Sequence, residues 1–323
     1  MLIKIAPIFP NWFKIIFKII IGFILKNIPY LNNLRKNGLT VFLYHEISDT
    51  PSDFSLKYDL AVSNDVFRKQ ILFIEKNFNI ISPDDLMLNK ILPKNAALIT
   101  FDDGLASTFE NGINFLVSRN IPSIFFLNMS SILVPEYFLP AQLSFYSERE
   151  PNFKKFCKSE NLYEPYFLSM TPSIFEKFNS HYKKKMNNGN LLSYQGPFVK
   201  KRTLLDWDNK LVFYGNHLYQ HWNSKSLNDT EFLNQFKKNE ELLLSFNKSV
   251  NFFSFPHGQY SKHHIKLLLD YGVSKIFCSS GGINKKPSAF FLDRMCLTNS
   301  ENSCFLMWYK IYLKNFKDYI KNL

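Results

Sequence analysis

Two adjacent carboxylates at the end of an apolar run are the strongest chemical signal in this sequence. Asp102 and Asp103 follow the run AALITF at 96–101 and precede Gly104, which permits a tight turn. The run predicts a buried strand, and α/β folds assemble their sites at the carboxyl ends of strands. Neighbouring side chains there point in different directions, so one carboxylate could hold a metal ion while the other accepts a proton. An Asp-Asp-Gly turn without a catalytic role is the alternative.

Two histidines four residues apart, His217 and His221, form the second candidate. On a helical turn this spacing would place both imidazoles on one face, where they could bind one metal ion. Two histidines and one aspartate leave positions open for water and substrate, as in a catalytic metal site. The pair alone is a weak signal, because surface and core histidines are more common than ligands.

Two further segments lie where predicted strands end. His45 follows Tyr44 near the end of the run 39–47, and the segment FSFPHG occupies 253–258. In the second segment, proline and glycine favour a rigid turn. By itself each segment predicts only a strand and a turn, and a lone histidine such as His45 is more often structural than catalytic.

Taken in this order, the segments resemble the polysaccharide deacetylase family, also called the chitooligosaccharide deacetylase homology domain, in its FxYPxG-type branch. The resemblance rests on TFDDG at 100–104, HxxxH at 217–221 and FSFPHG at 253–258, and spans about 39–297. An early Tyr-His pair is also usual in this branch. The resemblance implies an α/β fold, a distorted (β/α) barrel of about seven strands.

The resemblance also implies roles for individual residues. A divalent metal ion, Zn²⁺ before Co²⁺ or Ni²⁺, would be bound by Asp103, His217 and His221. Asp102 would be the general base toward the attacking water, and His45 is the candidate acid that protonates the departing sugar amine. The implied reaction removes an acetyl group from an N-acetylated sugar of a glycan or a lipid-linked saccharide.

Residues of the third motif and of a later strand would contact the substrate or support the ligands: Pro256, His257, Gly258 and Arg294. Ser254 stands where many relatives have an arginine that orients the base, and Arg294 is the expected substitute. Leu218, Trp222 and His257 also depart from the usual pattern, which puts the catalytic rate in doubt. Deformylation or O-deacetylation of a sugar, and a catalytically silent glycan- or membrane-binding module, are the alternatives.

The chain of 323 residues is long enough for one large domain, with 46% hydrophobic residues. We expect the barrel over 39–300, with strands at 39–47, 96–101, 123–128, 251–255 and 275–279. Helical spacing predicts helices over 67–78, 106–119, 228–246 and 262–271. The segment 134–203 is rich in Lys, Asn, Ser and Tyr and offers no clear strand, so we interpret it as an irregular insertion.

Both ends of the chain are basic and amphipathic. In the segment 1–38, the longest unbroken apolar run, 19–25, falls well short of the ~20 residues that span a bilayer. No cleavage site for a secretory signal follows it, which leaves an in-plane membrane anchor and a helix packed on its own domain. The C-terminal helix, 301–323, carries an aromatic side beside a lysine stripe, and the same two interpretations apply.

Charge and cysteine usage limit the partners. The net charge of +12 favours an anionic partner such as a membrane surface, whereas the dispersed lysines argue against nucleic acid. Four cysteines without a CxxC pair predict reduced thiols rather than a disulfide framework. We therefore expect a cytoplasmic enzyme, peripheral on the inner face of the membrane, that acts on an N-acylated saccharide. The oligomeric state is not predicted.

Overall fold

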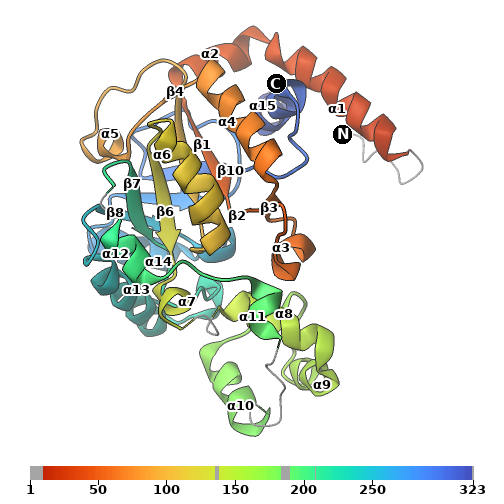
Figure 1. Cartoon of the computed structure of the whole chain (residues 1–323), viewed down its shortest axis with the longest axis vertical. Helices are drawn as coiled ribbons and strands as arrows, with labels where there is room; N and C mark the ends of the chain where they lie inside the picture. Colours follow the sequence, from red (N-terminus) through yellow and green to blue (C-terminus); the bar gives the residue numbers. More distant parts are fainter. Residues whose placement is uncertain (1–9, 135–137, 183–189, 208, 322–323) are drawn as a thin grey trace.

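Seven parallel strands form a closed barrel at the centre of the molecule (Figure 1). A computed structural model describes residues 10–134, 138–182, 190–207 and 209–321. The strands are β1 (Leu39–Tyr44), β5 (Ala96–Phe101), β6 (Ser123–Leu127), β7 (Val212–Asn216), β8 (Ser249–Ser254), β9 (Lys275–Cys278) and β10 (Phe291–Cys296). The barrel closes because β1 pairs with both β5 and β10. The predicted distorted (β/α) barrel of about seven strands is confirmed.

Three two-residue strands lie outside the barrel. β4 (Asn79–Ile80) pairs with β5 at its start, and β2 (Glu46–Ile47) pairs with β3 (Ala61–Val62) beside the end of β1. The expected strand over 39–47 is therefore divided at His45, which belongs to neither β1 nor β2. This break leaves His45 at the point where β1 ends.

The barrel strands are buried on both sides, as a parallel sheet covered by helices requires. Every residue of β1 and β5 is buried, and the two strands pair in register from Leu39 with Ala96 to Tyr44 with Phe101. Because paired residues end these two strands, the residues that follow them, His45 and Asp102, begin at the same level. The strand ends therefore bring the candidate site residues to one mouth of the barrel.

The main barrel helices begin at capping side chains. Ser63 accepts a hydrogen bond from the first turn of α4 (Asn64–Asn77), and Asn228 forms a capping box at the start of α13 (Asp229–Leu243). With α14 (Lys262–Asp270), these match three of the predicted helices. The shorter helices around the barrel are α3 (Asp53–Lys57), α5 (Pro83–Met87), α7 (Met129–Leu133), η5 (Ser224–Ser226) and η6 (Pro256–Gly258).

The predicted helix over 106–119 is present but is not uniformly α-helical. Its first part is a π-helix, η1 (Thr108–Ile113), and its second part is α6 (Asn114–Ser118). Inside the π-helix, Thr108 Oγ1 donates to the backbone oxygen of His45 at 2.5 Å. The turn therefore fixes the backbone of a candidate site residue.

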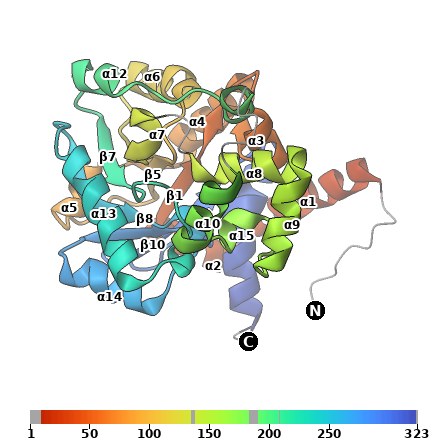
Figure 2. The ribbon, with the colours of Figure 1, turned by 90° about the horizontal axis from the view of Figure 1, so that it is seen from below.

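The insertion at 134–203 is helical rather than irregular. It contains α8 (Leu139–Arg149), α9 (Pro151–Ser159), η3 (Tyr166–Leu168), α10 (Pro172–Tyr182), α11 (Leu191–Gln195) and α12 (Lys201–Asp206), while 135–137 and 183–189 lie outside the described residues. Phe145, Phe153 and Phe178 are buried in its core. In Figure 1, α8, α9, α10 and α11 lie below the carboxyl ends of the strands, whereas α12 lies beside the barrel, and Figure 2, seen from below, shows α8 and α10 in front of the barrel.

Two helices outside the barrel join the two ends of the described chain. α1 (Asn11–Lys26) packs along α15 (Cys304–Lys321), and α2 (Pro29–Asn37) leads from α1 to β1. The approach is close, because a Cβ at Gly22 would lie 2.0 Å from the backbone oxygen of Phe305. Residues 1–9 of the predicted N-terminal segment, and 322–323 of the predicted C-terminal helix, lie outside the described residues.

The two helices differ in the environment of their apolar sides. On α15, Trp308 and Tyr312 are buried against the barrel, as the core-packed interpretation of the C-terminal helix expects. On α1 only Gly22 and Leu25 are buried. Eight large apolar side chains of α1 are exposed: Trp12, Phe13, Ile15, Ile16, Phe17, Ile20, Phe23 and Ile24.

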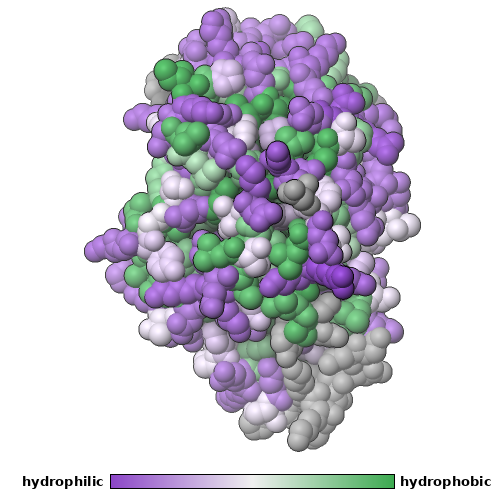
Figure 3. All heavy atoms as spheres, turned by 60° about the vertical axis from the view of Figure 1, so that its left-hand side comes forward, coloured by the Kyte–Doolittle hydropathy of each residue, from purple (hydrophilic) through white to green (hydrophobic). Residues whose placement is uncertain are grey.

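α1 projects along one side of the molecule in Figure 1, and these eight side chains are exposed, although the ring of Phe23 also contacts Phe305 of α15. The face of the barrel seen in Figure 3 differs from α1, because hydrophobic and hydrophilic side chains are mixed over most of it.

In the described part of the chain no single helix has the length and composition to cross a bilayer; α1 and α2 meet those criteria only as a pair bent by 74°.

Candidate metal centre

The turn after β5 carries both candidate aspartates. Asp102 continues the ladder through its backbone N–H, which donates to Tyr44 O at 3.1 Å, and Gly104 N–H donates to Asp102 O at 3.0 Å. Asp103 has a φ of 75° and Gly104 a φ of 97°, so the chain reverses through two left-handed residues. Both aspartates are buried, with exposed fractions of 2% and 3%.

The two histidines lie in the loop after β7 rather than on the helical turn that we predicted. Leu218 and His221 have φ angles of 60° and 56°, which no α-helix contains. The loop is held by buried amides: Asn128 Nδ2 donates to the backbone oxygens of His217 and Leu218, and Asn216 Oδ1 accepts from Leu218 N–H at 3.0 Å. The two imidazoles are therefore brought together by hydrogen bonds within a loop, and not by the geometry of a helix.

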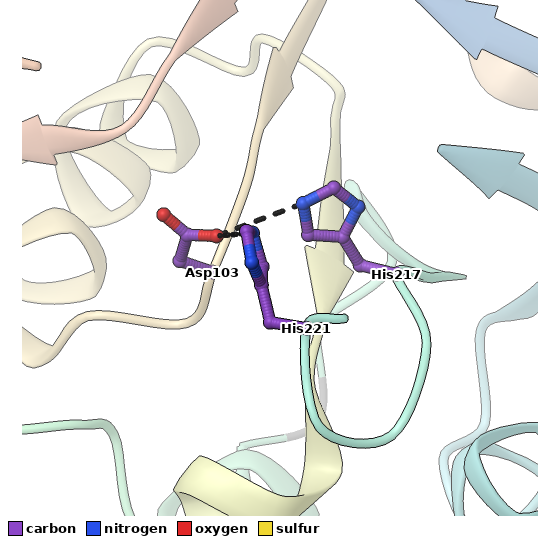
Figure 4. A group of neighbouring side chains, drawn as sticks. All are labelled: Asp103, His217 and His221. Carbon is purple, nitrogen blue, oxygen red and sulfur yellow. Dashed lines mark ion pairs between the residues drawn. The ribbon is translucent and has the colours of Figure 1, made fainter. Parts of the chain in front are cut away.

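Asp103, His217 and His221 converge on one point (Figure 4). Asp103 Oδ1 lies 3.1 Å from His221 Nε2 and 3.6 Å from His217 Nε2, and one ligand atom from each residue lies within 4.8 Å of the others. Asp103 Oδ1 is also buried without a hydrogen-bond partner among the described residues. One carboxylate and two imidazoles suit Zn²⁺ and similar ions, so this set fits a divalent metal.

The surroundings favour the ligand form of His217. Burial lowers the pKa of His217 to about 4, which keeps the ring neutral at pH 7. His217 Nδ1 lies 2.8 Å from Ser254 O, so its proton belongs on Nδ1 and Nε2 presents a lone pair. Burial alone would raise the pKa of Asp103, but the neighbouring His221 outweighs it, and the carboxyl pKa is lowered. Both groups are therefore in the protonation state that binds metal.

Asp102 is paired with Arg294, which reaches the site from β10. Arg294 Nη1 donates to Asp102 Oδ1 at 2.6 Å and Nη2 to Oδ2 at 2.7 Å, while Nη2 also donates to Ser254 Oγ at 2.6 Å. The guanidinium is fully buried. Burial opposes ionisation of Asp102, but the charge of Arg294 outweighs it and lowers the carboxyl pKa. Arg294 therefore contacts Asp102 from a different strand than the arginine that Ser254 replaces.

His45 faces the same pocket from the end of β1. Its Nδ1 lies 3.9 Å from Sγ of Cys296, the last residue of β10. Burial lowers the pKa of His45, but the contact with Cys296 and the charges of both aspartates outweigh burial and raise it to about 9. The ring is therefore protonated at neutral pH and can donate a proton into the pocket.

Cys296 is the residue of this site that the sequence analysis missed. It stands two positions after Arg294 on β10, so alternation along a strand places both side chains on the same side. The spacing of the two residues is visible in the sequence, but it predicts a site residue at 296 only if Arg294 is already known to face the site.

The third motif forms a short turn, η6, beside the ligands. His257 has a φ of 59°; its ring stacks on Phe167 at 4.8 Å and lies 4.5 Å from the ring of His221. Pro256 is buried, and Gly258 lines the same pocket as His257. Burial lowers the pKa of His257 well below its ordinary value, so this ring is neutral.

The metal-binding set, His45, Asp102 and the third-motif residues His257 and Gly258 line one pocket of about 370 Å³. Its floor is the barrel mouth, with His45, Asp102, Asp103, His217 and His221. Its walls are mainly apolar and come from the loop around α3 and from the insertion: Phe54, Tyr58, Leu60, Phe138, Pro140, Pro165, Phe167 and Leu168. The structure thus brings polar, chemically active groups from the barrel against an apolar cover from outside it.

Comparisons by sequence find no protein-family model and no curated protein that matches the chain. Comparison of structures finds IcaB from Ammonifex degensii, with 17% identity, 85% of this chain and 97% of that chain covered, and a TM-score of 0.57. A de-N-acetylase from Aggregatibacter actinomycetemcomitans has 15% identity, coverage of 84% and 99%, and a TM-score of 0.57.

A third similar structure is BC0361, a polysaccharide deacetylase from Bacillus cereus, with 12% identity, coverage of 84% and 69%, and a TM-score of 0.54. At these identities the similarity concerns the fold. It extends over 84–85% of this chain. The chain therefore has the fold of the solved polysaccharide deacetylases.

Proposed function

We propose that this protein is a metal-dependent deacetylase that removes the acetyl group from an N-acetylated sugar. One observation carries the proposal: Asp103, His217 and His221 form a metal-binding set in the same pocket as His45 and Asp102, the partner of Arg294. A metal-dependent amide hydrolase combines a Lewis acid, a base and an acid around one bond. The fold shared with a de-N-acetylase and a polysaccharide deacetylase supports the same activity.

In this reaction, a divalent ion held by Asp103, His217 and His221 would polarise the acyl carbonyl and acidify water. Asp102, kept ionised by Arg294, accepts the proton from the attacking water as its oxygen bonds to the acyl carbon. His45 then protonates the sugar nitrogen as the carbon–nitrogen bond breaks, because an unprotonated amide anion is a poor leaving group. The products are acetate and a free amine.

The test is acetate release from an N-acetylated hexosamine oligomer by the full chain loaded with Zn²⁺, Co²⁺ or Ni²⁺ in turn. We propose Zn²⁺ as the native ion, because one carboxylate and two imidazoles suit it. Asp103→Asn should lose metal and activity together, whereas Asp102→Asn should keep the metal and lose about 10²–10⁴-fold in rate. Asp270→Asn, on the surface of α14, is the control.

The same assay separates the alternatives. Mass spectrometry of the products distinguishes loss of acetyl from loss of formyl, and N-acetylated from O-acetylated substrates. A chain that binds metal but releases no acyl group from any of them would contradict the proposal and leave a silent binding module.

We also propose that the protein works at an anionic membrane surface, on the inner face of the membrane, where a lipid-linked saccharide would be within reach. The apolar side chains of α1 support this, since eight large ones are exposed on its surface. α1 also carries Lys14 and Lys18, and Lys18 Nζ lies 6.0 Å from the ring of Tyr309 on α15. An in-plane helix with apolar residues outward and flanking lysines fits an anionic interface.

Co-sedimentation with vesicles tests this second proposal. The full chain should bind phosphatidylglycerol-containing vesicles, and a triple change of Ile16, Ile20 and Phe23 to serine should remove the binding. The matched control changes Leu72, Leu244 and Leu269, which are also exposed but scattered, to serine. Equal sedimentation of both triple variants, or no preference for anionic over neutral vesicles, would contradict the proposal.

A further inference from the structure

A second pocket, of about 430 Å³, lies beside the metal pocket and takes no part in the proposed reaction. It is formed between α8 and α10 of the insertion, the histidine loop and the start of α13. The two pockets share no lining residue, but both are lined by the first turn of α8. Phe138 and Pro140 line the metal pocket, whereas Leu139 and Gln142 line the second pocket. In the chain, His221 of the metal pocket stands between Gln220 and Trp222 of the second pocket.

The second pocket is lined largely by side-chain amides, and we call it the amide pocket. They are Gln142, Asn179, Gln220, Asn234 and Gln235. Each amide both donates and accepts hydrogen bonds, as saccharide hydroxyls do. Phe175 and Trp222, with ring centroids 5.8 Å apart, supply an apolar wall. Amides beside aromatic rings suit a sugar, which has both hydroxyl groups and apolar C–H faces.

Part of this polar set is fixed in advance. Gln220 N–H donates to Gln235 Oε1 at 2.9 Å, and Gln235 Nε2 donates to Gln220 Oε1 at 2.9 Å. Trp222 Nε1 donates to the same Gln220 oxygen at 3.3 Å. Asn179 Oδ1 is buried and has no hydrogen-bond partner among the described residues. The pocket therefore offers a rigid amide pair and an acceptor that a ligand would satisfy.

The charges around the amide pocket select the class of saccharide. Two carboxylates, Glu176 and Glu231, line it, and no lysine or arginine does so within the described part of a chain whose net charge is +12. Oε2 of Glu231 accepts from Asn228 N–H in the helix cap, and among the described residues no hydrogen bond to Oε1 is found. A phosphate or carboxylate ligand would be repelled here, whereas an ammonium group would be attracted.

We infer that the amide pocket binds a saccharide unit that carries a free amine. The inference rests on the proposed function, since deacetylation produces that group. Gln220 and Trp222, which line the amide pocket, are the chain neighbours of the metal ligand His221. A saccharide unit bound in the amide pocket would therefore lie next to the metal centre. The pocket thus retains the deacetylated part of a chain while an acetylated unit occupies the metal pocket.

Calorimetric titration of the full chain with a β-1,4-linked glucosamine tetramer and with its fully N-acetylated form tests the inference. The double variant Glu176→Gln and Glu231→Gln should weaken binding of the amine tetramer by at least about tenfold and leave the N-acetylated form unchanged. A glutamine at 231 can still accept the capping hydrogen bond. The control, Glu110→Gln with Glu241→Gln, changes charge equally on exposed positions outside the pocket.

A further pair of variants locates the binding. Gln220→Ala with Asn179→Ala should weaken both tetramers, whereas Asp103→Asn should leave binding of the amine tetramer intact. Loss of amine binding in Asp103→Asn, or equal affinity in the carboxylate variant and its control, would overturn the inference. Because the titration requires no turnover, it remains decisive even if no acetate release is found.

Discussion

The barrel mouth and the insertion that faces it build opposite sides of one pocket by different means. The mouth places its groups through short, buried strand ends, where Asp102, His217 and Arg294 are held by hydrogen bonds with almost no exposure. The insertion contributes side chains that pack and make few polar contacts, such as Phe138 and Phe167. From this contrast we infer that the barrel carries the chemistry and that the insertion contributes to the choice of substrate.

The largest effect should come from breaking the buried pair in the mouth. Arg294→Met leaves Asp102 as an unpaired buried charge, so we expect unfolding free energy to fall by about 3–5 kcal/mol and activity to disappear. Arg119→Met, which breaks a partly exposed pair with Glu75, should cost no more than about 1 kcal/mol. Urea unfolding measures the loss of unfolding free energy in both variants. Similar losses in the two would contradict the difference between the buried pair and the exposed pair.

The same pair gives the barrel a pH dependence. Because the folded pKa of Asp102 is depressed, its contribution to stability is present above the ordinary carboxyl pKa of about 3.9 and is lost as pH falls through the lower folded value. Wild type should therefore lose stability more steeply than Arg294→Met as the pH falls below about 4. Parallel curves of unfolding free energy against pH would exclude this origin.

Replacing the proton donor should affect the chemistry without affecting metal binding. His45→Gln should lower kcat by about 10²–10⁴-fold with unchanged metal content. The wild-type rate should also fall as pH rises past about 9, where His45 loses its proton, and the variant should lack that decline. An aryl acetate, whose leaving group needs no proton, is the control substrate, and its hydrolysis should persist in the variant.

A change in the insertion should have a smaller effect that depends on the substrate. Phe167→Leu removes the ring that stacks on His257, so we expect kcat/KM to fall by about tenfold on a bulky saccharide and less on a small acetyl ester. Metal content should be unchanged. A uniform loss on both substrates would show that the insertion supports the chemistry and not only the substrate.

The smallest effect should come from Cys296→Ala. Removing the side chain beside His45 Nδ1 takes away a group that raises the pKa of the histidine, so the alkaline limit of activity should move down by about one pH unit. The rate at neutral pH should change little. Cys304→Ala, at an exposed position of α15, is the matched control, and an identical pH profile for both variants would contradict the role.

The parts of this molecule that could be predicted are those governed by local pattern. The apolar run before Asp102 predicts a buried strand correctly, and capping residues such as Ser63 and Asn228 mark helices that the structure contains. Strand β7 was not predicted, because Val212–Asn216 is short and ends in Gly215 and Asn216. His217 and His221 meet through loop hydrogen bonds from Asn128, a residue about ninety positions away. No local pattern reports such a contact.

The insertion was harder for a related reason. Its Phe145, Phe153 and Phe178 form a core among short helices, but at the level of composition they were indistinguishable from the phenylalanines found throughout the chain. Arg294 was identified only because Ser254 left an arginine missing. No missing motif residue indicated Cys296 in the same way.

The close contact at Gly22 has a consequence for the order of assembly. α1 precedes the barrel in the chain and α15 follows it, so α1 remains without its partner until the ribosome has passed all of the barrel strands. During that interval its apolar side chains are uncovered on every side. A bilayer near the ribosome would meet this helix before the rest of the fold has formed.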